Sequence, residues 1–380
     1  MRVAVVGGGP GGLYLAALVK QVEPAHEVMV WERGARDETF GFGVVFSDGA
    51  LGGIGAADPA LSASIADHFA RWERVDVRYR GETVSQDGYR FSAIERRTLL
   101  RLLRERARAV GATLHFGRSA PPVEELRSGF DLVVAADGVG SEVRAAHDFG
   151  TESTPRDSRF LWLGTDREFD ALTFGVVETP HGVMQVHAYP YAPGRSTFIV
   201  ETTDAVLARS GLDAPDRAPE GPIADLFADL LEGHRVVCRT PRWGRFTSVR
   251  NERWSRDGLV LLGDAAHTTH FSIGSGTKLA MEDALALAMA LSDHGAVPEA
   301  LAAYEAERKP VVARMQRVAE ISRDWFERVA EHVGAPAPEF AGRLLTRSGR
   351  IGHRDLPLLD RDHVRRVREW FGRAPAGVRP

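Results

Sequence analysis

The feature that most constrains this chain is a glycine-rich turn between a strand and a helix at its start. Residues 2–6 form a short β-branched run typical of a buried parallel strand, and residues 13–22 have the small and apolar composition of a helix. Between them, Gly7 permits a tight bend, Gly9 lets the backbone approach a pyrophosphate, and Gly12 lets helix and strand pack closely. This turn predicts a dinucleotide phosphate site at the helix N-terminus.

An acidic residue at the end of the next strand narrows the choice of nucleotide. That strand is predicted over residues 27–31, and Glu32 follows it, about twenty residues after the glycines. A carboxylate at this place accepts hydrogen bonds from ribose hydroxyls, so it favours FAD or NAD over NADP. The alternative is a glycine-rich turn followed by an ordinary surface glutamate.

Two later junctions between a strand and a turn carry aspartate next to glycine. Asp137-Gly138 follows a strand predicted over 131–136, and Gly263-Asp264 follows one predicted over 259–262. An aspartate at the mouth of a parallel sheet can accept hydrogen bonds from a sugar or ribityl chain, and a glycine lets the backbone approach a ligand. Each junction alone also fits an ordinary structural turn.

Glycines follow the second junction and precede another helix. Gly274 and Gly276 come before a helix predicted from about Leu279. Backbone N–H groups and the positive end of a helix dipole can support negative charge at the pyrimidine edge of a reduced flavin. Taken together, the separated signatures predict a chain that folds back on itself to hold one flavin dinucleotide.

The middle of the chain has a different pattern. Residues 174–177, 187–189 and 197–201 are rich in β-forming side chains, with turn signals at 180–182 and 192–194. They predict an antiparallel sheet inserted into the nucleotide-binding lobe.

The predicted fold class is α/β, with a Rossmann FAD-binding domain, an inserted antiparallel β-sheet and C-terminal helices. A surface loop is expected over 212–222 and a long helix over 299–333. We divide the chain into a first part of the FAD-binding domain, a substrate domain, a return segment of the FAD-binding domain, and C-terminal helices with a tail: 1–155, 156–245, 246–300 and 301–380.

Composition excludes several classes of protein. The formal charge of −4 at pH 7 argues against nucleic acid as the main partner. No apolar run approaches the length of a membrane span, and the first residues lack the pattern of a signal peptide. The single cysteine, Cys238, rules out an internal disulfide and fits a reducing, cytoplasmic location. Oligomeric state is not readable from these features.

The sequence predicts neither a metal site nor a hydrolase. His267 and His270 are three residues apart, but no further ligand completes a familiar metal spacing. The G-x-S-x-G turn of serine hydrolases is absent.

These motifs, in this order, resemble those of the single-component, FAD-dependent aromatic hydroxylases. Besides the three glycine and aspartate junctions, Arg96-x-x-Leu99 at a helix start resembles that family's arginine contact to FAD, and residues 41–44 resemble the loop beside its isoalloxazine ring. The resemblance covers nearly the whole chain. It implies a glutathione-reductase-like Rossmann lobe with the inserted sheet over the flavin, FAD as cofactor, NADH or NADPH as electron donor, and O2 as co-substrate.

From the motifs and the resemblance together we expect the following residues to contact FAD: Gly7, Gly9, Pro10, Gly11, Gly12, Glu32, Arg33, Val45, Arg96, Asp137, Gly138, Asp264, Gly274, Gly276, Thr277 and Lys278.

Departures from the common family pattern point to a narrower branch. Phe271 stands where the family usually has proline, and Lys278 where it usually has asparagine. With residues 31–48 and 272–278, these departures resemble a branch that includes salicylyl-CoA 5-hydroxylase, aminobenzoyl-CoA monooxygenase and the tryptophan hydroxylase of violacein biosynthesis. The W-x-W-x-I-P signature of flavin-dependent halogenases is absent.

This resemblance implies hydroxylation of salicylyl-CoA para to its hydroxyl group, giving gentisyl-CoA, with a flavin hydroperoxide as oxygen donor. A base that draws the phenol proton would speed the step by about 10²–10⁴. His270 is the candidate for this catalytic role because it precedes the glycines expected to cradle the flavin; the alternative is a packing histidine. Phe46, His187, Tyr189 and Phe271 are the candidate substrate contacts.

Alternatives to this function remain open at this point. One is hydroxylation of a free aromatic such as tryptophan or a natural-product intermediate, and another is a flavin dehydrogenase that inserts no oxygen. Arginines near the C-terminus offer cations for CoA phosphates, although a solvated helix face explains them as well. These arginines are Arg347, Arg350, Arg354, Arg365, Arg366 and Arg368.

Overall fold

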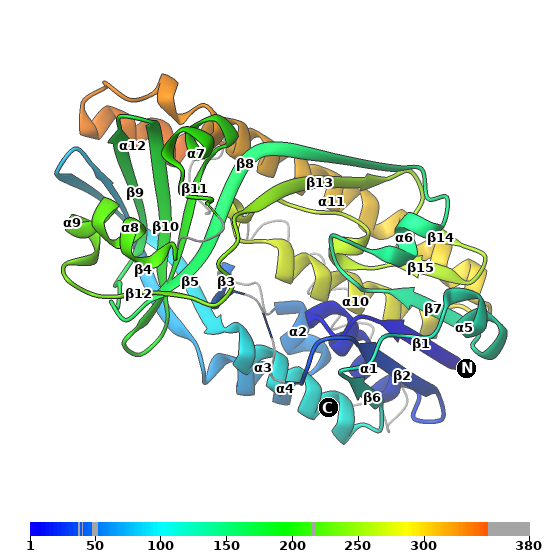
Figure 1. The fold of residues 1–380 in the computed structure, drawn as a ribbon. Coiled ribbons are helices and arrows are strands. Elements are labelled where there is room, and N and C mark those ends of the chain that lie inside the picture. The colour runs from blue at the N-terminus through cyan, green and yellow to red at the C-terminus, as the bar shows by residue number, and fades with distance from the viewer. Residues whose placement is uncertain (37–38, 40, 48–51, 215–217, 349–380) are drawn as a thin grey trace.

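The protein consists of two lobes, each built on one β-sheet, as the computed structural model in Figure 1 shows. The structure describes residues 1–36, 39, 41–47, 52–214 and 218–348. In that part of the chain, no helix has both the length and the apolar character needed to cross a bilayer. It also contains no group of three or more His, Cys, Asp or Glu side chains placed to hold a metal ion.

The first lobe contains the predicted Rossmann sheet. Its order is β14-β15-β7-β1-β2-β6, and all neighbouring strands are parallel except β14 and β15. The strands are β1 (Arg2–Val6), β2 (Glu27–Glu32), β6 (Thr113–Phe116), β7 (Leu132–Ala135), β14 (Ser255–Arg256) and β15 (Leu259–Leu261). Because β15 pairs with β7, the chain returns to this sheet after the long insertion, as the sequence predicted.

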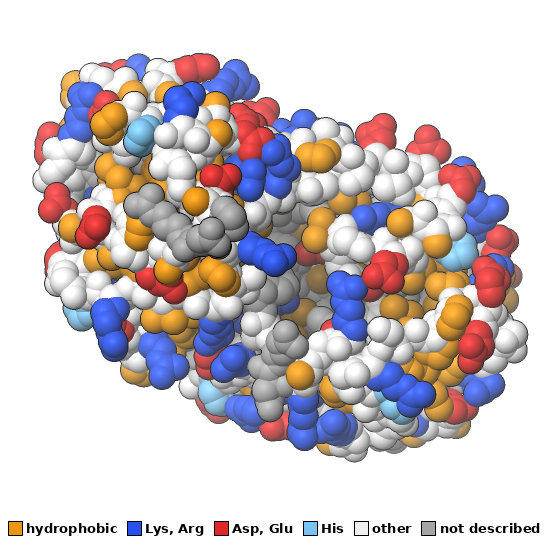
Figure 2. Space-filling view, in the orientation of Figure 1, with side chains coloured by type: hydrophobic (Ala, Val, Ile, Leu, Met, Phe, Trp, Pro, Cys, Tyr) orange, Lys and Arg blue, Asp and Glu red, His pale blue; other side chains and the backbone are white. Residues whose placement is uncertain are grey.

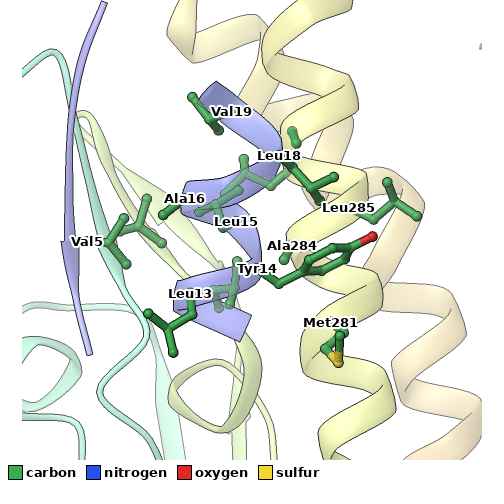
Figure 3. Packing of buried hydrophobic residues seen from close by; sticks show 14 of the residues in the cluster. Val5, Leu13, Tyr14, Leu15, Ala16, Leu18, Val19, Met281, Ala284 and Leu285 are labelled. Atoms are coloured by element: carbon green, nitrogen blue, oxygen red, sulfur yellow. The ribbon is translucent and has the colours of Figure 1, made fainter. Parts of the chain in front are cut away.

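Two helices from opposite ends of the chain pack together in this lobe. Helix α1 (Pro10–Val22) starts at the glycine turn, and α10 (Gly276–Asp293) starts after the second junction. Figure 3 shows Tyr14 and Leu18 of α1 beside Ala284 and Leu285 of α10. The expected start of α10 at about Leu279 was three residues too late. This contact brings the two glycine signatures to one place.

The second lobe is built on a nine-stranded sheet. Its order is β12-β8-β11-β10-β9-β4-β5-β3, with β13 also paired to β8, and only β4 and β9 are parallel. The strands are β3 (Gly43–Ser47), β4 (Ala70–Tyr79), β5 (Glu82–Glu95), β8 (Thr151–Thr165), β9 (Leu172–Thr179), β10 (Gly182–Ala192), β11 (Arg195–Thr203), β12 (Val236–Cys238) and β13 (Gly244–Asn251). The sheet therefore draws three strands from residues 43–95, outside the segment 156–245 to which the sequence analysis assigned it.

The remaining helices cover the sheets and join the lobes. Helix α11 (Val297–Glu327) continues through Pro310 and confirms most of the predicted helix over 299–333. The expected loop over 212–222 is partly wrong, because α8 (Glu220–Leu226) begins inside it. The other helices are α2 (Gly52–Ala57), α3 (Pro59–Ala66), α4 (Arg96–Ala109), α5 (Val123–Gly129), α6 (Glu142–Ala146), α7 (Asp204–Ser210), α9 (Ala228–Leu231) and α12 (Ala337–Thr346), with short 3-10 turns η1 (Gly263–Ala265), η2 (Phe271–Ile273) and η3 (Val329–Glu331).

Candidate functional site

A cavity of about 920 Å³ runs from the glycine turns of the first sheet to the face of the second. Figure 2 shows the corresponding recess between the two lobes, with basic side chains on its border. One end is lined by backbone and polar groups and the other by aromatic rings. The cavity therefore offers a polar part and an apolar part within one continuous space.

The glycine turn after β1 approaches its neighbours so closely that side chains do not fit. Gly7 has a φ of +113°, and a Cβ there would lie 2.2 Å from the carbonyl oxygen of Ala136. A Cβ on Gly12 would lie 2.2 Å from the carbonyl oxygen of Gly7. At Gly9, by contrast, a Cβ would meet no protein atom within 4 Å, although the residue lines the cavity. Contacts within the protein thus leave no room for a side chain at Gly7 and Gly12, whereas the space at Gly9 is open to a ligand.

Replacing Gly12 with alanine is expected to abolish retention of FAD. The new Cβ collides with backbone, which overpacks the turn at a cost of about 1–3 kcal/mol and displaces the N–H groups at the start of α1. The measurement is the flavin content of the purified variant. Gly342→Ala is the matched control, because Gly342 lies in α12 with open space at its Cβ position and alanine favours helices. Normal flavin content in Gly12→Ala would contradict this account of the turn.

Glu32 and Arg33 lie at the end of β2 and line the same part of the cavity. The Glu32 carboxylate accepts hydrogen bonds from the backbone N–H groups of Gly8 and Gly34, both at 2.8 Å. These bonds fix the carboxylate beside the glycine turn, where its remaining lone pairs can receive ribose hydroxyls. Arg33 forms an exposed ion pair with Glu142.

Two aspartates face the middle of the cavity with acceptor atoms to spare. One carboxylate oxygen of Asp137 accepts from the backbone N–H of Glu142 at 3.0 Å, whereas the other, Oδ1, is buried and has no partner among the described residues. Burial raises the pKa of Asp264, against the opposing effects of His267 and Arg96. Both carboxylates therefore have oxygen atoms that suit hydrogen bonds from hydroxyl groups of a bound ligand.

Arg96 is held at the start of α4 on the other side of this region. Its backbone N–H donates to the carbonyl oxygen of Phe42 and its Nε to the hydroxyl of Thr39, at 2.7 and 3.0 Å. Burial lowers the pKa of Arg96, although the charge of Asp264 opposes this shift. The guanidinium is thus a buried cation that lines the cavity.

The N-terminus of α10 closes the polar part of the cavity. Gly274, Gly276 and Thr277 line it, together with Val45 of β3, and no side chain caps the first N–H groups of the helix. The start of α1 is likewise without a side-chain cap. Two uncapped helix N-termini facing one cavity are suited to negatively charged or electron-rich groups of a ligand.

These residues fit FAD. Their backbone N–H groups, carboxylates and helix N-termini are the donors and acceptors that pyrophosphate, ribose and ribityl hydroxyls, and an electron-rich ring edge would need. All the predicted cofactor residues line the cavity except Lys278. Lys278 is instead 2.6 Å from the carboxylate of Glu282 on the same helix and is not among the described residues that border the cavity.

The far end of the cavity is walled by aromatic side chains. Phe271 of η2 lies edge-on to Phe160 of β8, with 5.3 Å between ring centroids, and near Trp162 at 6.3 Å. Phe174 of β9 and Phe246 of β13 also line this end. Such a wall suits a flat aromatic ring and excludes water from it.

Three of the four predicted substrate contacts line the cavity, and the fourth does not. His187 and Tyr189, two residues apart on β10, both line the cavity, and the Tyr189 hydroxyl donates to the carbonyl oxygen of Gly43 at 3.1 Å. Phe271 lines it as well. Phe46 does not: it is 1% exposed and packs against Phe69 in the core of the first lobe, because it lies on the opposite face of β3 from Val45.

His270 lies behind the cavity wall. It is 1% exposed and is not among the described residues that line the cavity. Its Nε2 is 3.2 Å from Oε1 of Glu201, while Nε2 of His187 is 2.9 Å from Oε2 of the same carboxylate. Of the two histidines that share this carboxylate, only His187 faces the cavity.

Glu201 is a candidate site residue that was not predicted from the sequence. It is 1% exposed in β11, and it accepts a further hydrogen bond from the Ser158 hydroxyl at 2.7 Å. Burial would raise the pKa of Glu201, but its interactions with His270 and His187 outweigh this effect and hold the pKa below the usual value. A signal was present, since a carboxylate in the otherwise apolar run Phe198-Ile199-Val200 needs a buried partner.

Comparison with known proteins agrees with this architecture. The FAD binding domain family matches residues 1–319. The chain is 46% identical to salicyloyl-CoA 5-hydroxylase of Streptomyces sp, over 98% of this chain and 74% of that protein. It is 39% identical to 3-hydroxy-4-methyl-anthranilyl-[aryl-carrier protein] 5-monooxygenase of Streptosporangium sibiricum, over 94% of this chain and 97% of that protein.

A solved structure supports the fold. The structure of 2-methyl-3-hydroxypyridine-5-carboxylic acid oxygenase superposes with a TM-score of 0.70 at 21% identity, covering 92% of this chain and 96% of that one. The family match, the close relatives and the fitted cavity together confirm the resemblance stated from the motifs. The chain belongs to the FAD binding domain family and is an FAD-dependent monooxygenase that uses a reduced nicotinamide and O2.

Proposed function

We propose that this protein hydroxylates the ring of salicylyl-CoA para to its hydroxyl group, giving gentisyl-CoA. The observation that carries the proposal is the continuity of the cavity, in which the predicted FAD-binding groups and an aromatic wall with a carboxylate-bound histidine border one space. The high identity to a salicyloyl-CoA 5-hydroxylase supports this choice of substrate.

The overall reaction balances with the co-substrates of the family. When bound, FAD supplies the transfer of two electrons from NADH or NADPH to O2, so that one oxygen atom enters the ring and the other leaves as water. The glycine turn of α1, Glu32, Asp137, Asp264 and the start of α10 would hold the cofactor. The protein's own contribution is binding, orientation, exclusion of water and movement of the phenol proton.

The aromatic wall and His187 provide these contributions for the substrate. Phe160, Phe174 and Phe271 hold a flat ring and keep water out of the apolar end. We assign proton acceptance to His187. The phenol O–H bond breaks as a bond forms between the proton and the nitrogen of His187 that faces the cavity, and the phenolate then directs oxygen to its para carbon. His270 acts through Glu201 and does not contact the substrate.

The position of the CoA arm is a separate question within this proposal. Six arginines near the C-terminus are candidate phosphate ligands from the sequence. Arg347 does not suit that role, because its guanidinium donates to Ser322, Leu344 and Ser272. Arg350, Arg354, Arg365, Arg366 and Arg368 lie outside the described residues, as does Asp48 of the motif that favoured this branch.

The test is turnover by the purified holoenzyme. We expect salicylyl-CoA to stimulate NADH or NADPH oxidation and to yield gentisyl-CoA with one atom from labelled O2, whereas free salicylate and tryptophan do not. Salicylate attached to an aryl carrier protein is a further substrate to be assayed, because the protein from Streptosporangium sibiricum is named for a carrier-linked substrate. Turnover of salicylate or tryptophan but of neither thioester, or a product without labelled oxygen, would refute the proposal.

A further inference from the structure

A chain of hydrogen bonds leads from Arg347 to the carboxylate behind His187. Arg347, which follows α12, donates from Nε to the hydroxyl of Ser322 on α11 at 2.8 Å. The Ser322 hydroxyl is 2.8 Å from that of Ser272, which is 2.8 Å from Nδ1 of His270. Nε2 of His270 then contacts Glu201 at 3.2 Å. Residues from four separate parts of the chain thus meet behind the cavity wall.

The direction of donation along this chain is determined at both ends. A guanidinium can only donate, so the Ser322 hydroxyl accepts a hydrogen bond from Arg347 and donates one to Ser272. The backbone N–H of Ser272 also donates to Nδ1 of His270, at 3.4 Å. Nδ1 is therefore an acceptor, and Nε2 carries the proton that is donated to Glu201.

The same carboxylate determines the tautomer of His187. Because Glu201 is ionised, Nε2 of His187 must donate to it, which leaves Nδ1 without a proton. Nδ1 makes no hydrogen bond among the described residues and belongs to a side chain that lines the cavity. Nδ1 is thus the nitrogen of His187 that is left to accept a proton.

Arg347 is bound in this place without a carboxylate of its own. Its guanidinium lies over the rings of Phe174 and Phe326, at 5.1 and 4.7 Å, and makes no ion pair among the described residues. Burial lowers the pKa of Arg347 to about 10, so the group remains charged at neutral pH. Because its guanidinium is a permanent donor, the chain cannot carry a proton outward; it can only orient and polarise the groups that follow.

The charges around His187 act in opposite directions. Burial lowers the pKa of His187, Glu201 raises it, and the charge of Arg347 lowers it further. The balance favours an uncharged imidazole before the phenol proton arrives.

We propose that Arg347 is a positioning residue for the hydroxylation: through Ser322, Ser272, His270 and Glu201 it fixes which nitrogen of His187 faces the substrate and keeps that nitrogen free of a proton. The inference rests on the proposed function, in which His187 accepts the phenol proton. It adds a role for a residue that touches neither the substrate nor the cofactor, and it explains why the end of α12 packs against the cavity wall.

The test is the pH dependence of kcat in Arg347→Gln. Removing the cation makes His187 easier to protonate, so the acid limb of the profile moves to higher pH. We expect kcat to fall by up to about tenfold at pH 6 and to recover toward the wild-type value at pH 8.5, with FAD retained. Arg347→Lys keeps the charge and should leave the acid limb in place. Arg343→Gln is the matched control, since within the described part of the chain Arg343 forms only an exposed pair with Glu339 on the same helix.

A second measurement separates this inference from the choice of substrate. Histidines labelled with ¹⁵N in the holoenzyme report the tautomer and titration of His187, whose signal is assigned by its loss in His187→Gln. We expect a proton on Nε2 at pH 7 and a titration at higher pH in Arg347→Gln than in wild type. An unchanged titration would overturn the role of Arg347 whatever the substrate is, whereas absence of salicylyl-CoA turnover with this titration shift would refute only the proposed function.

Discussion

Replacing His187 with glutamine is expected to lower kcat for hydroxylation by about 10²–10⁴ while leaving FAD bound. Glutamine keeps a polar side chain on β10 but has no group that can accept the phenol proton at neutral pH. The remaining activity should rise with pH, because an alkaline medium ionises the phenol without help from the protein. Steady-state kinetics across pH, together with flavin absorbance, gives the measurement.

Two comparisons make the His187 result specific. His270→Gln should lower kcat by a smaller factor, and the remaining activity should still depend on His187, because His270 reaches the substrate only through Glu201. His181→Gln, at the exposed turn before β10, should leave kcat unchanged. A His187 variant with the wild-type pH profile would show that the phenol is deprotonated elsewhere.

Replacing Asp283 with asparagine is expected to destabilise the protein by about 3–5 kcal/mol. Asp283 on α10 is fully buried; its Oδ2 lies 2.6 Å from Nε2 of His267, and its Oδ1 accepts from Nε of Arg308 at 2.8 Å. It also accepts from the backbone N–H of Gly263. Asparagine removes the negative charge beside the buried guanidinium of Arg308. It also loosens the turn that carries Asp264. The measurement is denaturant-induced unfolding of the variant and of the wild type.

The stability difference should depend on pH in a definite direction. Burial would raise the pKa of Asp283, but His267 and Arg308 outweigh it and hold the pKa below its ordinary value. Such a carboxylate contributes stability above its unfolded-state pKa and loses that contribution as the pH falls through its folded-state pKa. The penalty of Asp283→Asn should therefore shrink in acid. Glu339→Gln, which breaks an exposed pair, should change stability by less than about 1 kcal/mol at any pH.

The polar end of the site was predictable from sequence because local rules govern it. Close backbone contacts between neighbouring elements require Gly7 and Gly12. The strand and helix patterns on either side of these glycines predict the turn. Asp137 and Asp264 follow buried strands directly, and parallel strands end at one edge of a sheet. Each of these residues takes its place from elements adjacent to it in the chain.

The apolar end depends on long-range register, which local patterns do not contain. The strands β4 and β5 were not recognised, since exposed polar residues hide their alternation, as in the run Glu82 to Gln86 of β5. Glu201 meets His187 only because β10 and β11 pair with Ile199 opposite His187. His270 precedes the glycines predicted to bind the flavin, yet its loop turns the ring into the protein interior. The alternation of β3 would, however, have corrected Phe46 once Val45 was assigned to the cavity.

The pairing of β15 with β7 and of α10 with α1 has a consequence for biosynthesis. As the ribosome releases the chain, β7 and α1 emerge before β15 and α10, the elements that they contact and that follow only after the entire second sheet. A nascent chain that ends before Gly276 has neither the second uncapped helix start nor the helix that covers α1 (Figure 3). The inserted sheet can therefore assemble during synthesis, whereas the cofactor-binding lobe is completed only after α10 has emerged.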